Sequence, residues 1–270
     1  MLKTKISIIG CGWLGLPLAK YLIEEGFDIK GSTTSHLKLD HLKSSNIDPY
    51  VIRLSETKIE GDVDRFLLNS KIVIINIPPG LRKNPNKNHV NEIRHLITHI
   101  EAQHIKYVLY ISSTSVYKNE VSMPNITEEN LPNAVSNNGK QLITIEQMLQ
   151  NNPNFETTIL RFSGLLDAKR HPGQMLSGKM DLKNGDAPIN LIHKDDCIKI
   201  ISELIKGNIW NAVFNASNPF HPSKKSYYTQ YCKANHLPLP HFNTSLKNEG
   251  KLIDSSKLVQ LLNYSFETAL

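Results

Sequence analysis

A strand, a glycine-rich turn and a helix follow one another without interruption near the start of the chain. Residues 6–9 read as a buried strand, and they run into Gly10, Gly12 and Gly15, spaced as G-x-G-x-x-G. In this pattern the first glycine permits a tight turn, the second lets the backbone approach a pyrophosphate, and the third lets the helix pack on its strand. The phosphates would lie at the helix N-terminus, where free N–H groups favour anions. The alternative is a glycine-rich turn without a ligand, and the rest of the chain must decide between the two.

The residue that follows the second strand predicts which dinucleotide would bind. Folds that select NAD usually carry Asp or Glu about 20 residues after the first glycine, where it binds the adenosine ribose. Gly31 stands at that position, and Asp28 and Asp40 lie too early and too late. The hydrogen-bonding residues there are Ser32, Thr33, Thr34, Ser35, His36 and Lys38. They would tolerate a 2′-phosphate, so the sequence predicts NADP(H) in preference to NAD(H). The alternative is that Lys38 is only a solvated helix residue.

Alternating strand and helix patterns continue through the chain. Strands are expected at 50–54, 71–77, 107–111 and 157–162, with helices ending near 103 and spanning 139–150. Such alternation predicts an α/β protein with a doubly wound parallel sheet, the Rossmann fold. Prolines end the strand at 71–77 on the edge where cofactors bind. The expected cofactor contacts are Gly10, Gly12, Trp13, Leu14, Gly15, Thr33, Thr34, Ser35, Lys38, Pro78, Pro79 and Ser112.

The chain loses its regular pattern after residue 163. Residues 1–163 with 190–222 are expected to form the dinucleotide-binding domain, and 164–189 with 223–270 a small C-terminal substrate lobe. Further strands are expected at 190–193 and 212–215, and helices after 195, near 223–235 and at 255–263. Four residues in or beside this lobe could meet an anionic small-molecule substrate, or could belong to a solvated loop: Arg161, Arg170, His171 and Lys179.

Composition limits the classes of protein that fit. A chain of 270 residues with 40% hydrophobic content can bury one large core with a smaller lobe. The three cysteines, Cys11, Cys197 and Cys232, lack metal-type spacing, which favours a reduced cytoplasmic compartment and no bound metal. No signal sequence or membrane-spanning run is evident, so no membrane association is expected.

The basic balance of the chain does not indicate a nucleic-acid-binding protein. The net charge is +6 and the pI about 9.0. However, the lysines are scattered, and no basic stretch is interleaved with aromatic residues. A solvated lysine-rich surface explains this charge, and the sequence implies no particular oligomeric state.

Several of these motifs together resemble one superfamily. The glycine motif, residues 111–117, Arg161 with Gly164, and residues 191–196 are similar to extended short-chain dehydrogenases/reductases, which include sugar-nucleotide epimerases and dehydratases. The resemblance covers nearly the whole chain and is least specific over its last 50 residues. The sequence Pro-Pro-Gly at 78–80 and the compact C-terminal lobe look more like the atypical branch of that superfamily.

The resemblance implies a Ser/Thr, Tyr and Lys triad with the spacing Y-x-x-x-K on one helix. Ser113 matches the Ser/Thr position and Lys140 matches the lysine, but Ser136 stands where the tyrosine would be. A positioned proton donor typically contributes about 10²–10⁴ in rate. Tyr117 and His193 are the available substitutes, although a histidine before a helix is more often a capping residue.

Two functions follow from this pattern. The first is an NAD(P)-dependent oxidoreductase or epimerase that acts on a small polar, carbonyl or sugar-nucleotide substrate. The second is a redox or nucleotide sensor that keeps the cofactor cleft without the chemistry.

Overall fold

A seven-stranded parallel sheet organises the fold, with the strand order β12-β9-β7-β6-β1-β2-β3. The computed structural model describes residues 3–270. In chain order the strands are β1 (Lys5–Ile9), β2 (Asp28–Thr33), β3 (Asp48–Val51), β6 (Ile72–Ile75), β7 (Tyr107–Ser113), β9 (Glu156–Phe162) and β12 (Val213–Ala216). The strand order reverses where β1 pairs with β6 in parallel. Open α/β sheets bind ligands at this switch point, and the predicted doubly wound sheet is confirmed.

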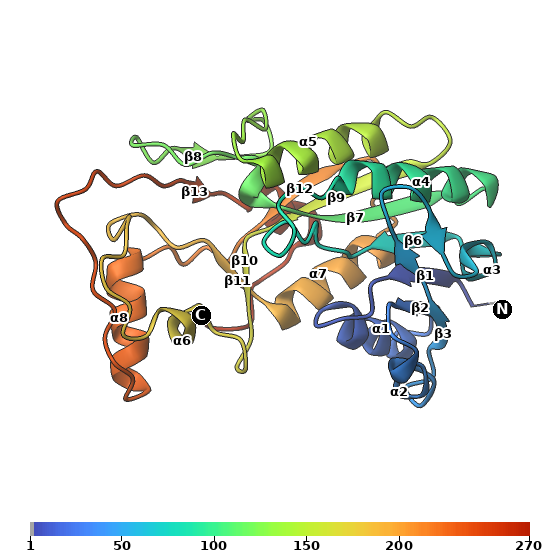
Figure 1. The fold of residues 1–270 in the computed structure, drawn as a ribbon, viewed down its shortest axis with the longest axis horizontal. Helices are drawn as coiled ribbons and strands as arrows, with labels where there is room; N and C mark the ends of the chain where they lie inside the picture. The colour runs from blue at the N-terminus through green and yellow to red at the C-terminus, as the bar shows by residue number, and fades with distance from the viewer. Residues whose placement is uncertain (1–2) are drawn as a thin grey trace. The chain divides into compact units, whose positions relative to one another are not determined.

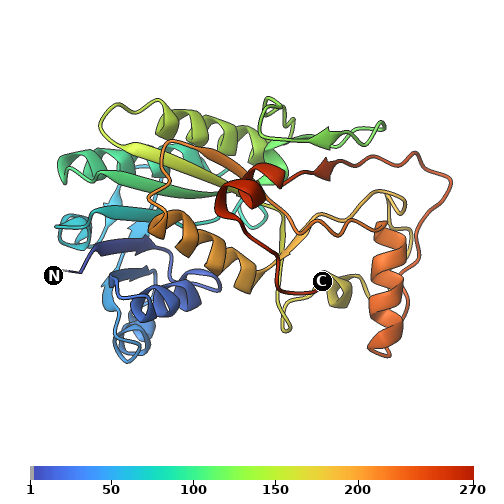
Figure 2. The same cartoon turned by 180° about the vertical axis from the view of Figure 1, so that it is seen from behind.

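The chain divides into two compact units, and the first contains most of the sheet. It comprises the residues up to Ser113, Val135–Leu160 and Ile201–Val213. Its helical segments are α1 (Gly15–Glu24), the single 3₁₀ turn η1 (His36–Lys38), α2 (Leu39–Lys43), α3 (Val63–Leu67), α4 (His89–Ala102) and α5 (Asn137–Gln150). Figures 1 and 2 show α4 and α5 on one face of the sheet and α1 and α2 on the other. Since both faces are covered, β6 is apolar and buried along its length.

Local signals explain where these helices begin and end. Gly26 has φ of +93°, a left-handed conformation that follows the end of α1. The Asn88 side chain accepts a hydrogen bond from the Asn91 N–H and caps α4. The Ser136 hydroxyl accepts one from the Gly139 N–H at 3.1 Å and caps α5. The predicted helices 139–150 and up to 103 are therefore confirmed to within two residues.

The second unit comprises Thr114–Ala134, Arg161–Ile200 and Phe214–Leu270. Its elements are the 3₁₀ turn η2 (Thr114–Val116), β8 (Asn125–Ile126), β10 (Gly164–Leu166), α6 (Pro172–Leu176), β11 (Leu191–His193), α8 (Lys224–Ala234), β13 (Leu252–Ile253) and α9 (Ser256–Leu262). Helix α7 spans Lys194–Lys206. The strands pair as β10 with β11 and β8 with β13, both in parallel. The division predicted at residues 163, 190 and 222 stays a prediction.

One expectation about local structure is wrong. The strand predicted at 50–54 breaks at Ile52, because β4 (Arg53–Leu54) leaves the sheet and pairs antiparallel with β5 (Ile59–Glu60). Hydrogen bonds across this hairpin decide the conformation, and the local pattern of residues 50–54 does not contain them. The loop-rich segment after Gly164 holds the short elements β10, which pairs with the distant β11, and α6, which begins at Pro172 with the His171 side chain as its cap.

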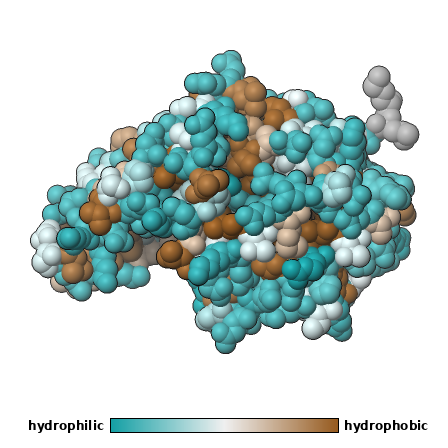
Figure 3. Space-filling model, turned by 90° about the horizontal axis from the view of Figure 1, so that it is seen from above, coloured by the Kyte–Doolittle hydropathy of each residue, from teal (hydrophilic) through white to brown (hydrophobic). Residues whose placement is uncertain are grey.

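The visible surface is mainly hydrophilic. Figure 3 shows hydrophobic residues scattered among hydrophilic ones on the face that it presents. Within residues 3–270, none of the helices has both the length and the apolar character that crossing a membrane requires.

Candidate functional site

The glycine turn between β1 and α1 is a tightly packed crossing of backbone on backbone. Gly10 has φ of +100°, and a Cβ placed there would lie 2.5 Å from the Asn76 carbonyl oxygen. A Cβ on Gly15 would lie 2.1 Å from the Gly10 carbonyl oxygen. By contrast, a Cβ on Gly12 would meet no atom within 4 Å. Gly10 and Gly15 are thus required by the fold, whereas Gly12 leaves open space beside its backbone, as a phosphate-binding turn needs.

Side chains from two other strands hold this turn in place. The Gly10 N–H donates to Ser32 Oγ at 3.0 Å. The Asn76 amide Nδ2 donates to the Gly10 carbonyl at 3.1 Å. The turn after β1 is therefore fixed to the carboxyl ends of β2 and β6, and it can hold its N–H groups ready for an anion without reorganising.

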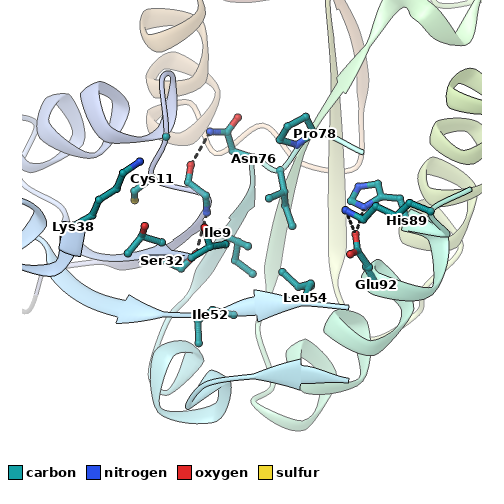
Figure 4. A pocket seen from close by; sticks show the side chains of 16 residues that line it. Ile9, Cys11, Ser32, Lys38, Ile52, Leu54, Asn76, Pro78, His89 and Glu92 are labelled. Atoms are coloured by element: carbon teal, nitrogen blue, oxygen red, sulfur yellow. Dashed lines mark hydrogen bonds and ion pairs between the residues drawn. The ribbon is translucent and has the colours of Figure 1, made fainter. Parts of the chain in front are cut away.

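A cavity of about 280 Å³ opens at this edge of the sheet within the first unit (Figure 4). Its walls come from the glycine turn, the carboxyl ends of β2 and β6, β4 and the start of α4. The lining residues are Ile9, Gly10, Cys11, Gly12, Ser32, Thr33, Thr34, Lys38, Ile52, Leu54, Asn76, Ile77, Pro78, Lys87, His89 and Glu92. It joins the glycine turn to hydroxyl groups, an apolar wall and a charged cluster, an arrangement that suits a nucleotide.

Half of the predicted cofactor contacts line this cavity. Gly10, Gly12, Thr33, Thr34, Lys38 and Pro78 do so, whereas Trp13, Leu14, Gly15, Ser35, Pro79 and Ser112 are not among its lining residues. No local pattern marked Ile52, Leu54, Lys87, His89 or Glu92 as site residues, because folding brings each of them to the cavity. Asn76 also lines the cavity, and its place directly after a buried strand is the one signal that could have found it.

Packing explains why Gly31 occupies the position at which NAD-selective folds carry an acid. A Cβ there would lie 2.6 Å from the Ile47 side chain and 2.7 Å from Cys11 Sγ. Cys11 is itself buried, which raises the pKa of its thiol to about 12, so it fills space and stays protonated. Of the described residues that line the cavity, Glu92 is the only carboxylate, and it belongs to α4 and not to β2.

A charged cluster forms the α4 side of the cavity. His89 Nδ1 lies 2.7 Å from Glu92 Oε2, and Lys87 Nζ lies 2.8 Å from the same oxygen. Burial alone would raise the pKa of Glu92, but the hydrogen bonds from His89 and Lys87 outweigh it and lower that pKa. Glu92 is therefore an ionised acceptor.

Ser112 and Ser113, at the end of β7, have different surroundings. The buried Ser112 Oγ donates to Glu146 Oε1 of α5 at 2.5 Å, which explains why it does not line the cavity. Ser113, the predicted catalytic serine, is only partly buried and is the last residue of β7. Lys140 is exposed on α5 and lines no cavity described here. Its catalytic role, like that of Ser113, stays a prediction.

Tyr117 belongs to a buried hydrogen-bonded group in the second unit. Its hydroxyl accepts from Arg161 Nη1 at 2.5 Å and donates to Asn215 Oδ1 at 3.3 Å. Tyr117 and Arg161 are 2% and 4% exposed. Since the hydroxyl satisfies a buried guanidinium, the structure gives Tyr117 and Arg161 structural partners.

We therefore expect Tyr117→Phe to lower the free energy of unfolding by about 1–3 kcal/mol, because Arg161 would lose a buried acceptor. Urea denaturation followed by far-UV circular dichroism measures this. Tyr50→Phe is the matched control: its hydroxyl bonds the exposed Asp48 at 3.0 Å, and its loss should change stability by about 0.5 kcal/mol or less. A Tyr117→Phe protein with unchanged stability and lost turnover would instead establish a catalytic role.

The remaining predicted residues of the second unit have different surroundings. His193 Nδ1 accepts from the Asp195 N–H at 3.2 Å at the start of α7, which is the capping arrangement. Among the residues considered for an anionic substrate, His171 is buried against Tyr227 and Tyr231, whereas Arg170 and Lys179 are exposed.

The chain was compared with protein families, with curated proteins and with solved structures. No family model matches it. Protein YeeZ of Escherichia coli K12 is 30% identical over 265 residues, which covers 97% of this chain and 96% of YeeZ.

Two solved structures share the fold. A short-chain dehydrogenase/reductase superfamily protein from Agrobacterium tumefaciens with bound NAD is 15% identical, with a TM-score of 0.77 over 98% of this chain and 93% of that one. UDP-glucuronic acid 4-epimerase from Bacillus cereus, in complex with UDP-glucuronic acid and NAD, is 20% identical, with a TM-score of 0.77 over 98% and 95%. The chain therefore belongs to the family of protein YeeZ and has the fold of the NAD-dependent epimerase/dehydratase-like short-chain dehydrogenases/reductases.

Proposed function

We propose that this chain binds a nicotinamide adenine dinucleotide at the switch point of its sheet and is an NAD(P)-dependent oxidoreductase or epimerase-like enzyme. The observation that carries the proposal is the cavity formed by the glycine turn and the ends of β2 and β6. Open space beside Gly12 suits a pyrophosphate, and Thr33, Thr34 and Lys38 suit the adenosine ribose. The NAD held by two solved structures of the same fold supports it.

Such a cofactor supplies hydride transfer, and the chain must supply the groups that orient the substrate and move protons. We propose that Ser113, at the carboxyl end of β7, polarises the oxygen of a small polar substrate, such as a carbonyl compound or a sugar nucleotide. Tyr117 and His193 remain the predicted proton carriers, and Lys140 the predicted ribose contact. Isothermal titration with NADH and NADPH tests binding, and a carbonyl and sugar-nucleotide panel, followed by absorbance at the nicotinamide band, tests turnover.

A sensor that binds the cofactor without turning over a substrate is the second candidate. Ser136, at the position of the superfamily tyrosine, is occupied as the N-cap of α5, and the Tyr117 hydroxyl is held by Arg161 and Asn215. Dinucleotide binding together with no turnover on the whole panel would favour this function. Turnover that is lost in Ser113→Ala would exclude it.

The preference for NADP(H) is also a proposal, and it rests on Lys38 and the adjacent hydroxyl groups. We expect Lys38→Ala to weaken NADPH binding about tenfold, since a hydrogen bond to a charged group contributes about 1.5–3 kcal/mol. NADH affinity should change less than about twofold, because NADH carries no 2′-phosphate for Lys38 to contact.

Lys43→Ala is the matched control for this variant, because Lys43, the last residue of α2, is exposed as Lys38 is but does not line the cavity. Isothermal titration of both variants provides the measurement. Tighter binding of NADH than of NADPH by the wild type would contradict the preference.

A further inference from the structure

His89, the first residue of α4, is buried, and both its backbone and its ring are held by hydrogen bonds. His89 is 1% exposed. Its backbone N–H donates to Gln141 Oε1 at 2.7 Å, and Gln141 also bonds the Lys87 carbonyl at 2.9 Å. With Nδ1 bonded to Glu92, both the backbone and one ring nitrogen of His89 are fixed.

The ionised Glu92 selects the tautomer of this ring. A carboxylate can only accept a hydrogen bond, so Nδ1 of His89 carries a proton, and in the uncharged form of the ring this is the one proton. The second nitrogen, Nε2, then carries a lone pair and is an acceptor. Lys87 Nζ also pairs with Glu92 Oε2, at 2.8 Å, and balances the charge of this carboxylate.

The acceptor Nε2 has no partner in the folded chain. Among residues 3–270, the protein supplies no hydrogen bond to this buried atom. An unsatisfied buried polar atom destabilises a protein by about 1–3 kcal/mol. A ligand that brings an N–H group to Nε2 would recover this free energy.

The order of residues around the cavity indicates which part of a dinucleotide would reach His89. Figure 4 shows Ser32 and Lys38 on one side, then Ile52 and Leu54, and then Glu92 with His89 on the other side. The ribose is expected beside Ser32 and Lys38. The next group along the molecule is the base, whose flat apolar face suits Ile52 and Leu54. Its polar edge would then face α4.

We infer that His89 is a specificity-determining residue that accepts a hydrogen bond from the exocyclic amino group of adenine, in the tautomer held by Glu92. The inference rests on the proposed dinucleotide function and assigns the base recognition to one atom. Adenine offers an N6 amino donor, whereas hypoxanthine has a carbonyl oxygen there, which would place one lone pair against another. The cavity therefore distinguishes the two bases through Nε2.

The experiment compares the reduced adenine dinucleotide with its hypoxanthine analogue, in which a carbonyl oxygen replaces the amino group at C6 and the neighbouring N1 carries a proton. Fluorescence titration of the wild-type protein should show about tenfold tighter binding of the adenine form, the ratio that corresponds to about 1.4 kcal/mol. In His89→Phe, which keeps a ring but removes the acceptor, the ratio should fall below about twofold. The loss should come from weaker adenine binding.

His99→Phe is the matched control on the same helix. His99 pairs with Asp64 at 2.8 Å and does not line the cavity, so its substitution should leave the ratio unchanged. Glu92→Gln keeps an acceptor for Nδ1 and should retain most of the discrimination. Where His89→Phe does not fold, ¹⁵N NMR of the wild-type histidines replaces it: the Nε2 resonance should shift on addition of the adenine form and not of the hypoxanthine form.

The outcomes separate this inference from the proposed function. A protein that binds neither dinucleotide removes the proposed function. Binding of both with similar affinity, a preference for hypoxanthine, or discrimination that persists in His89→Phe leaves dinucleotide binding in place and overturns the role of His89.

Discussion

The Gly12→Ala variant is expected to fold as the wild type does and to bind a nicotinamide dinucleotide at least about tenfold more weakly. A Cβ at residue 12 meets no protein atom within 4 Å, so the free energy of unfolding should change by about 1 kcal/mol or less. The same methyl group would occupy the space that a pyrophosphate needs beside the backbone. Losing one or two hydrogen bonds to a charged ligand, each about 1.5–3 kcal/mol, accounts for the expected decrease in affinity.

Gly15→Ala provides the contrast within the same turn. Its Cβ would lie 2.1 Å from the Gly10 carbonyl oxygen and 2.9 Å from Asn76 Nδ2, so the backbone must move. We expect the free energy of unfolding to fall by about 2–3 kcal/mol, together with dinucleotide affinity.

Urea denaturation and isothermal titration on both variants give the two readouts. Wild-type affinity in Gly12→Ala would show that the pyrophosphate does not lie against this turn. Wild-type stability in Gly15→Ala would refute the close approach of α1 to Gly10.

Acidification from pH 7 to pH 4 is expected to destabilise the second unit, and His171 is the cause that the structure identifies. Burial lowers the pKa of His171 from 6.5 to about 4. Its Nδ1 accepts from the Gly173 N–H at 3.0 Å, and its ring stacks on Tyr231 at 3.6 Å. Both nitrogens are engaged, since Nε2 lies 2.9 Å from the Tyr227 hydroxyl.

The sign follows from the depressed pKa. Between pH 6.5 and about 4 the unfolded chain binds a proton at this residue that folded His171 does not bind. The free energy of unfolding therefore decreases as the pH decreases. The contribution of neutral His171 is fully present above pH 6.5 and is lost below about 4. A shift of this size corresponds to roughly 3 kcal/mol at most.

His171→Asn keeps a capping acceptor and does not titrate. It should be less stable than the wild type at pH 8, and the difference should shrink by roughly 2 kcal/mol at pH 4.5. Urea denaturation by circular dichroism over this range measures both curves. The exposed His36→Asn variant should follow the wild-type curve, and a constant difference between wild type and His171→Asn would contradict the assignment.

The residue at position 31 shows what local sequence pattern can predict about cofactor preference and what it cannot. Gly31 at the diagnostic position was visible in the sequence, and it predicts the absence of an acid there. The reason was not visible, because Ile47 and Cys11 close on Gly31 only after β2 has packed between its neighbours. Similarly, Ser136 stands at the tyrosine position in the sequence, but only the folded chain shows its hydroxyl occupied as a helix cap.

Tyr117 and His89 show two kinds of information that local pattern does not contain. Tyr117 follows a hydroxyl-rich strand end, which predicts a catalytic group, and the folded chain adds that Arg161 and Asn215, distant in the chain, hydrogen-bond its hydroxyl. His89 begins the helix α4, and the sequence predicted only the apolar face of this helix. Its charged partners and the cavity beside it depend on a loop and on β4, whose course the sequence did not predict.

The sequence by itself determined the glycine turn, the alternation of strands and helices, and thus the parallel sheet with its switch point. These features depend on residues that are near neighbours in the chain, where spacing and backbone freedom decide the conformation. Only the tertiary structure decided which side chains face the cavity and which are occupied elsewhere. Hydrogen bonds between distant residues such as Asn76 and Gly10 or Ser112 and Glu146 set that division, and no local pattern encodes them.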